Sequence, residues 1–221
     1  MTFPIHPSCR GVKKIAMNRG LTALVALVAI VFSCLVEAGL DEGIAAMQSN
    51  NYQAAFQEFQ PLADQGVAEA QFLLGNMYAD GLGVTEDPAR ALSLYRLAAE
   101  QGLAHAQLSL GDAYFLAIGV PEDFSEAVNW YRRAAEQGHP QAQFKLASMY
   151  SAGQGIKQDN ILAYIWCSVS AKSTPNGEAV RRCDRIAPRM TKDEIARAKE
   201  QASKFVPKQG HILHPLFKLV P

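Results

Sequence analysis

Few residues of this chain have the type and spacing that acid–base catalysis requires. Histidine is the side chain that most often exchanges a proton near neutral pH, so His105 and His139 are the first candidates. Each lies just after a Gln-Gly pair that ends at Gly102 or Gly138, a dipeptide typical of a turn between helices. We therefore expect both histidines to be exposed turn residues and not catalysts.

A second pair of histidines, His211 and His214, has a spacing that could bind a metal ion weakly. No cysteine or carboxylate lies near them in the sequence, and Pro215 follows directly. We expect residues 207–221 to form a flexible tail, and the sequence predicts neither a metal site nor a cofactor.

Nucleophilic catalysis is not indicated either. A serine enzyme that reacts with β-lactams would carry Ser-x-x-Lys, but Ser168 lies four residues before Lys172 and Ser170 lies two before it. The sequence also lacks a G-x-S-x-G elbow, a phosphate-binding loop and an H-E-x-x-H motif. We predict no catalytic residues, and so a protein that is not an enzyme.

Three aspartates recur at a 36-residue interval, at Asp87, Asp123 and Asp159. This interval would distribute the carboxylates along the molecule instead of bringing them to one site. Aspartate side chains accept hydrogen bonds well from the free backbone N–H groups at the start of a helix. We therefore expect each aspartate to cap a helix.

The same 36-residue interval relates many other residues and defines the organisation of the chain. Series of alanine, glycine and tyrosine keep this step without insertion. The repeated positions are Ala55, Ala91 and Ala127; Gly66, Gly102 and Gly138; Gly75 and Gly111; Tyr78, Tyr114 and Tyr150; Tyr95 and Tyr131; and Gly83, Gly119 and Gly155. Interleaved series of this kind indicate copies of one structural unit.

Each copy has the pattern of two helices. In the third copy, Ala127, Trp130, Tyr131 and Ala134 fall on one apolar stripe at helical period, and a second helical run follows over residues 142–150. A helix pair of this size cannot bury its apolar faces alone. The sequence therefore predicts an all-α protein in which antiparallel helix pairs stack into a superhelical solenoid.

The repeat resembles the Sel-one-like repeat, a longer relative of the tetratricopeptide repeat. The resemblance rests on the segment from Ala127 to Gly138, on the segment from Ala142 to Tyr150 and on the turn at Gly155, and it extends over residues 41 to about 206. It implies an interaction scaffold or adapter that binds a protein or peptide on the concave face.

For such a scaffold we expect the contact residues on the exposed side of the first helix of each pair. The alternative is a cell-envelope enzyme or small-molecule binder, related to the cell wall or to β-lactams, that uses the same groove. A host-interaction factor would differ in its partner and not in its physical chemistry.

The predicted solenoid has three regular repeats, one modified repeat and two caps. The ranges are 39–52 for an N-terminal capping helix, 53–88, 89–124 and 125–160 for repeats 1 to 3, 161–190 for modified repeat 4, and 191–206 for a C-terminal capping helix. Thr191 followed by Glu194 predicts a capping box at the start of the last helix.

Residues 1–38 have the features of a secretory signal peptide, with Met17 as an alternative start. Four basic side chains precede an apolar run from Leu21 to Val36, which is shorter than the roughly 20 residues of a membrane span. Cleavage is expected after Ala38. We predict a periplasmic or secreted protein whose only membrane contact is this signal; the alternatives are an uncleaved anchor or a lipid on Cys34.

The charge of the chain argues against nucleic acid as a partner. Removing residues 1–38 takes away four of the 21 basic side chains and one of the 21 acidic ones, which leaves a formal charge of about −3. A mildly acidic protein without a basic stripe is a poor ligand for polyanions.

Cys167 and Cys183 are the cysteines that would remain after that cleavage. Cys167 falls 36 residues after Tyr131, and Pro175 lies midway between the two cysteines, so antiparallel helices would bring them together. Because exported proteins retain disulfides, we favour a Cys167–Cys183 bridge over two buried free thiols. A bridge closing about 15 residues would contribute about 3 kcal/mol in the loop-entropy model.

Overall fold

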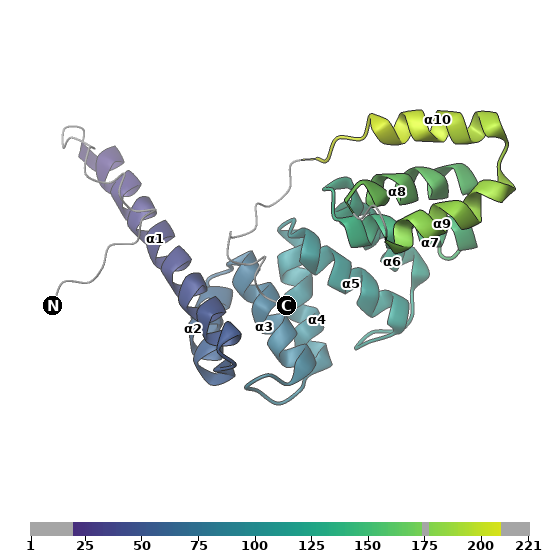
Figure 1. The fold of residues 1–221 in the computed structure, drawn as a ribbon. Helices are drawn as coiled ribbons and strands as arrows, with labels where there is room; N and C mark the ends of the chain where they lie inside the picture. Colours follow the sequence, from purple (N-terminus) through teal and green to yellow (C-terminus); the bar gives the residue numbers. More distant parts are fainter. Residues whose placement is uncertain (1–19, 174–176, 209–221) are drawn as a thin grey trace.

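The computed structural model describes residues 20–173 and 177–208, which fold into a row of antiparallel helices with short connections (Figure 1). The helices are α1 (Gly20–Gln48), α2 (Tyr52–Asp64), α3 (Ala68–Asp80), α4 (Pro88–Glu100), α5 (Ala104–Leu116), α6 (Phe124–Glu136), α7 (Pro140–Ala152), α8 (Asn160–Ser173), α9 (Glu178–Ile186), the 3₁₀ turn η2 (Ala187–Arg189) and α10 (Lys192–Ser203). Every regular element in these ranges is helical. The predicted all-α solenoid is confirmed.

The repeat consists of a first helix (α2, α4, α6 or α8) and a second helix (α3, α5, α7 or α9). The repeated aspartates precede three of the first helices, as expected. In each case the backbone N–H three residues later donates to the Oδ1 of Asp87, Asp123 or Asp159, at 3.0, 3.0 and 2.9 Å. The second helices α3, α5 and α7 each pack more extensively on the first helix of the next pair than on that of their own pair.

Each regular second helix ends in a residue with left-handed backbone conformation. Gly81 and Gly153 take φ values of 66° and 72°, and Ala117 takes 57° at the equivalent position of α5. Ala117 therefore makes the same turn as the glycines, although a Cβ in this conformation costs about 1 kcal/mol or more. The turn is preserved because the surrounding helices fix its two ends.

The small and aromatic residues of the repeat fit one another directly. Tyr131 on α6 lies against Gly111 on α5, where an added Cβ would come within 2.6 Å of the ring. The Tyr131 hydroxyl donates to Asp112 Oδ1 at 2.6 Å, and burial together with this bond raises the pKa of Tyr131. Tyr95, Gly75 and Asn76 form the same arrangement one repeat earlier, with a Cβ–ring approach of 2.7 Å and a hydrogen bond of 2.8 Å.

Buried glutamines connect three successive helices. The side-chain amide of Gln107 on α5 donates to the Ala99 carbonyl at the end of α4, at 3.1 Å. Its Oε1 accepts from Gln137 at the end of α6, at 2.8 Å. Gln71 makes the same two bonds one repeat earlier, to the Ala63 carbonyl and from Gln101. The sequence indicates a turn at each Gln-Gly dipeptide. It does not indicate that the glutamine of the dipeptide bonds to a buried glutamine of the preceding second helix.

Helix α1 runs without a break through Ala38, so no structural boundary separates the predicted signal from the predicted capping helix. Gly39 and Gly43 allow its C-terminal part to sit on Leu62 and Phe59 of α2. Its N-terminal part extends away from the other helices (Figure 1). Over residues 20–173 and 177–208, the helices lack the combination of length and hydropathy that a membrane span needs.

The C-terminal helix α10 packs back along α8 (Figure 1). It begins at Thr191, whose side chain and backbone form the predicted capping box with Glu194. Beyond α10, the Phe205 ring meets the Trp166 ring of α8 edge to face, with centroids 5.5 Å apart. Most of the predicted tail, residues 209–221, lies outside the described residues, as do His211 and His214 and residues 1–19 of the predicted signal.

Candidate functional site

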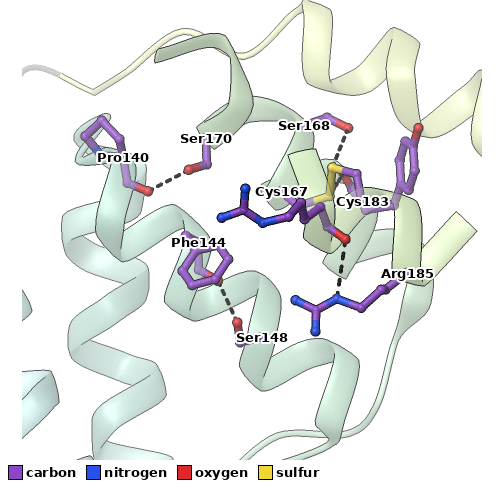
Figure 2. The surroundings of a disulfide bond; sticks show 10 residues. Pro140, Phe144, Ser148, Cys167, Ser168, Ser170, Cys183 and Arg185 are labelled. Carbon is purple, nitrogen blue, oxygen red and sulfur yellow. Dashed lines mark hydrogen bonds between the residues drawn. A yellow bond between two sulfur atoms is a disulfide. The ribbon is translucent and has the colours of Figure 1, made fainter. Parts of the chain in front are cut away.

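The serine and lysine side chains near α8 take part in structural contacts. Ser170 Oγ donates to the Pro140 carbonyl of α7 at 2.8 Å (Figure 2), and Lys172 Nζ donates to a backbone carbonyl of α10. Ser168 Oγ lies 3.7 Å from Cys183 Sγ. These groups hold neighbouring helices together and do not form a pair of nucleophile and base.

The structure contains a disulfide between Cys167 on α8 and Cys183 on α9 (Figure 2), the pairing that the sequence favours. The two Cα atoms are 5.7 Å apart, within the range that a disulfide spans. Both cysteines are buried, and they join the two helices of the fourth repeat. Over the described residues, no group of three His, Cys, Asp or Glu side chains is arranged to hold a metal ion.

The expectation that His105 and His139 are exposed turn residues is wrong. Both side chains are half-buried, and their rings meet edge to face with centroids 4.6 Å apart. The reason is that the stacking of repeats places each turn beside the turn of the next repeat, so a large turn side chain meets its neighbour there.

Burial disfavours the charged form of both imidazoles. It lowers the pKa of His105, and burial together with the nearby His105 lowers the pKa of His139 to about 4. His139 is also the residue that precedes α7, and its Nδ1 accepts from the Ala142 backbone N–H at 3.5 Å. The equivalent positions, Val67 and Leu103, are apolar and make no such bond.

Side chains of successive second helices contact one another directly. Phe72 on α3 and His105 on α5 have ring centroids 6.1 Å apart, and His105 in turn meets His139 at α7. The Arg182 guanidinium of α9 lies 5.2 Å from the centroid of the Phe144 ring on α7. These contacts form a row of side chains along the second helices.

A pocket of about 420 Å³ lies at the C-terminal end of this row of side chains. Its walls come from the start of α7, from α8 and from the start of α9. The lining residues are His139, Pro140, Gln141, Phe144, Ser170, Gly177, Glu178 and Ala179. We use the name inner groove for this pocket together with the adjoining row of rings of His139, His105 and Phe72. The expectation that contact residues lie on the first helices stays a prediction.

The walls of the pocket combine apolar surface with a carboxylate, and a guanidinium group lies near them. Phe144 and Pro140 supply apolar surface, and Glu178 supplies a carboxylate. Arg182 lies beside it over the Phe144 ring; its partial burial and the nearby Arg185 lower its pKa. Such a mixture suits a peptide, which presents apolar side chains and backbone amides together. It does not suit a polyanion, which needs a stripe of basic residues.

Comparison with protein families identifies the repeat. The sequence profile described as Sel1 repeat matches residues 68–103, 104–139 and 140–173. Each matched unit begins at a second helix and ends with the next first helix, which is the pairing that packs most extensively here. The ranges predicted above, 53–88 and onward, start half a repeat earlier with the same 36-residue step.

The crystal structure of a Sel1 repeat protein from Oxalobacter formigenes is 35% identical to this chain, with a TM-score of 0.55. The match covers 59% of this chain and 97% of that protein. The chain belongs to the Sel1 repeat family. Sel1 repeats are protein–protein interaction scaffolds and are generally not enzymes, so protein partners are expected of this family in general.

A second solved structure also matches a large part of the chain. It is a protective antigen present in uropathogenic Escherichia coli strains and displays an SLR fold. It is 24% identical, with a TM-score of 0.46, and the match covers 69% of this chain and 40% of that protein. No curated protein matches the chain.

Proposed function

We propose that this Sel1 repeat protein is an exported scaffold that binds a protein or peptide along the inner groove. The observation that carries the proposal is the pocket between α7 and α9, whose wall residue His139 is also the last of a row of aromatic and imidazole rings along the second helices. Aromatic side chains are enriched where proteins bind one another, because they bury much apolar area at low conformational cost.

The shape of the groove favours an extended ligand. Ring contacts run from Phe72 on α3 through His105 on α5 to His139, the residue before α7, so they touch three successive second helices. A peptide segment in extended form covers about 3.3 Å per residue and can follow such a row. The pocket would then hold one large side chain of that peptide.

A capture experiment with matched variants tests this function. The chain purified from the periplasm is used to capture proteins from envelope extract, in parallel with Phe144→Lys in the groove and Leu97→Lys on α4. Leu97 is 48% exposed on a first helix, away from the groove, so its variant controls for the added charge. We expect one stoichiometric partner with the unchanged chain and with Leu97→Lys, and none with Phe144→Lys.

Two outcomes would contradict the proposal. One is capture that Phe144→Lys leaves unchanged, since the partner would then bind elsewhere. The other is turnover of a cell-wall fragment or a β-lactam by the purified protein, which would favour the enzyme alternative. The pocket volume is within the range of small-molecule sites, but Ser170 Oγ, its hydroxyl group, is bonded to the Pro140 carbonyl.

Export is part of the proposal and rests on two features. The first is the basic and then apolar sequence of residues 1–38. The second is the Cys167–Cys183 disulfide, which persists in an oxidising compartment. N-terminal sequencing of the protein from periplasmic extract should begin at Gly39; a chain found only in the cytosol with its N-terminal segment intact would contradict export.

A further inference from the structure

The residues after α10 are fixed to the turn between α6 and α7. The Lys208 backbone N–H donates to the Glu136 carbonyl at 2.8 Å, and its Nζ forms an ion pair with the Glu136 carboxylate at 2.6 Å. The Pro207 ring lies beside Gly138, where an added Cβ would come within 3.0 Å of it. Three contacts from two adjacent residues thus hold this part of the chain at one point of the third repeat.

That point adjoins the inner groove. Gly138 directly precedes His139, which is both the residue before α7 and a wall of the pocket. Glu136 is the last residue of α6, two residues before Gly138. Lys208, the last residue that the structure describes, therefore lies beside the turn that leads into a wall of the pocket.

The segment that follows, residues 209–221, has the composition of a peptide ligand. Six of its 13 residues are large apolar ones: Ile212, Leu213, Leu216, Phe217, Leu219 and Val220. Lys218 is its only basic residue besides two histidines, and it has no acidic residue. At about 3.3 Å per residue, 13 residues reach about 43 Å, enough to cross several helices spaced about 10 Å apart.

We propose that residues 209–221 bind in the inner groove of the same chain, with Phe217 or a neighbouring apolar side chain in the pocket beside Phe144. The groove is then covered by its own ligand until an external protein or peptide displaces it. This inference rests on the proposed function, since it assigns an internal competitor to the same groove. Tethering at Lys208 raises the effective concentration of the segment to the millimolar range, so even weak intrinsic affinity keeps the groove filled.

The specific arrangement is tested by photo-crosslinking in the full chain. Phe217 is replaced by the photoreactive residue benzoylphenylalanine, the protein is expressed with its own N-terminal segment, and crosslinks are mapped by mass spectrometry after illumination. We expect crosslinks within one chain to residues 139–144 or 177–182. Crosslinks that join two copies, or that form only outside the inner groove, would overturn the proposal.

A second measurement does not depend on the crosslinker. Hydrogen exchange of residues 139–147 is compared between the unchanged chain and the Leu216→Asp/Phe217→Asp variant. We expect severalfold faster exchange in the variant, and protection restored by a synthetic peptide of residues 209–221. Lys199→Asp on the exposed side of α10 is the control for charge and should leave exchange unchanged. Equal exchange in all three proteins, with no effect of the peptide, would overturn the proposal.

The two proposals fail in distinguishable ways. If the segment does not bind but the groove has an external partner, capture from extract still depends on Phe144 and no groove crosslink forms. If the segment binds but there is no external partner, the crosslinks form and the Leu216→Asp/Phe217→Asp variant captures nothing. If both proposals hold, that variant captures more partner than the unchanged chain.

Discussion

The regular repeats and the fourth repeat solve one packing problem in two ways. In the second and third repeats a tyrosine at the middle of the first helix lies against a glycine of the preceding second helix and donates to a polar side chain there, as Tyr131 does with Gly111 and Asp112. At the equivalent positions the fourth repeat has Cys167 and Ala147. The cysteine bonds forward to α9 instead of backward to α7.

The difference follows from the position of the repeat in the stack. The second helices α3, α5 and α7 are each covered by the first helix of a following repeat. In the described part of the chain, helix α9 is followed by η2 and by α10, which packs on α8. A covalent bond to α8 therefore replaces the packing that the next repeat supplies elsewhere. The larger Ala147 is tolerated because Cys167 is much smaller than a tyrosine.

The largest loss of stability should come from giving a regular repeat the residue pair of the fourth repeat, which is a cysteine on the first helix and an alanine on the preceding second helix. Tyr131→Cys removes a fully buried ring, so we expect a loss of about 3–5 kcal/mol in unfolding free energy. Gly111→Ala alone should cost about 1–3 kcal/mol because the new Cβ meets the ring. The double variant should lose less than the sum, since the smaller side chain leaves room for the methyl group. Urea denaturation of all four proteins measures this coupling, and strict additivity would contradict it.

Removing the disulfide should have the next largest effect. The Cys167→Ala/Cys183→Ala variant should lose about 3 kcal/mol, and the loss should be confined to α8, α9 and α10. Hydrogen exchange resolved by segment checks this: α9 should become the least protected helix of the solenoid while α5 is unaffected. Two free-thiol adducts on the native periplasmic protein would show that the bond is absent.

Breaking one connection between regular repeats should have an intermediate effect. Gln107→Leu removes a buried donor to the Ala99 carbonyl and the acceptor for Gln137. We expect a cost of about 1–3 kcal/mol, because both partners lose a hydrogen bond in a buried place. Gln158→Leu, which removes an exposed side-chain bond to the Ser151 carbonyl, is the matched control and should cost much less. Equal costs for the two variants would show that burial does not matter here.

A small gain in stability is expected at the turn after α5. Ala117 stands there, whereas a glycine follows α3 and α7. Ala117→Gly should stabilise the protein by about 1 kcal/mol, since it removes a Cβ from a left-handed residue. The reverse change, Gly81→Ala, should cost a similar amount in the turn after α3. Thermal unfolding of both variants measures the pair, and a destabilised Ala117→Gly would refute the assignment of strain.

The smallest effect at neutral pH is expected for His139→Leu, which restores the residue type of Leu103. The pKa of His139 is lowered to about 4 from 6.5, so the unfolded chain binds the proton more readily than the folded one. His139 therefore makes stability fall as the pH decreases from about 6.5 to 4, and the variant should show a flatter decrease over this range. Identical pH profiles of the melting temperature would contradict the role of this imidazole.

The sequence predicts the fold of the described residues well because the repeat imposes the same contacts many times. The 36-residue step locates the helices and the capping aspartates, since each of these is a local property of the chain. The inner groove was not predicted, because His105 and His139 meet only when the turns of adjacent repeats stack. Phe72, Leu108 and Phe144 also keep the 36-residue step. This series is the signal in the sequence that points to the groove. The spacing alone does not tell whether such residues are buried or form a binding surface.

The glutamine contacts have a consequence for how such proteins change length during evolution. The side chains of Gln71 and Gln107 each donate a hydrogen bond to the preceding first helix and accept one from the glutamine that ends the following first helix. Both repeats therefore offer the same hydrogen-bonding groups to their neighbours. Duplication of a 36-residue segment that carries this glutamine would insert a unit whose buried side-chain amide forms the same two hydrogen bonds with its new neighbours. Lengthening the solenoid therefore needs no compensating substitution at either junction, whereas an insertion of another length would leave a buried amide without its partner.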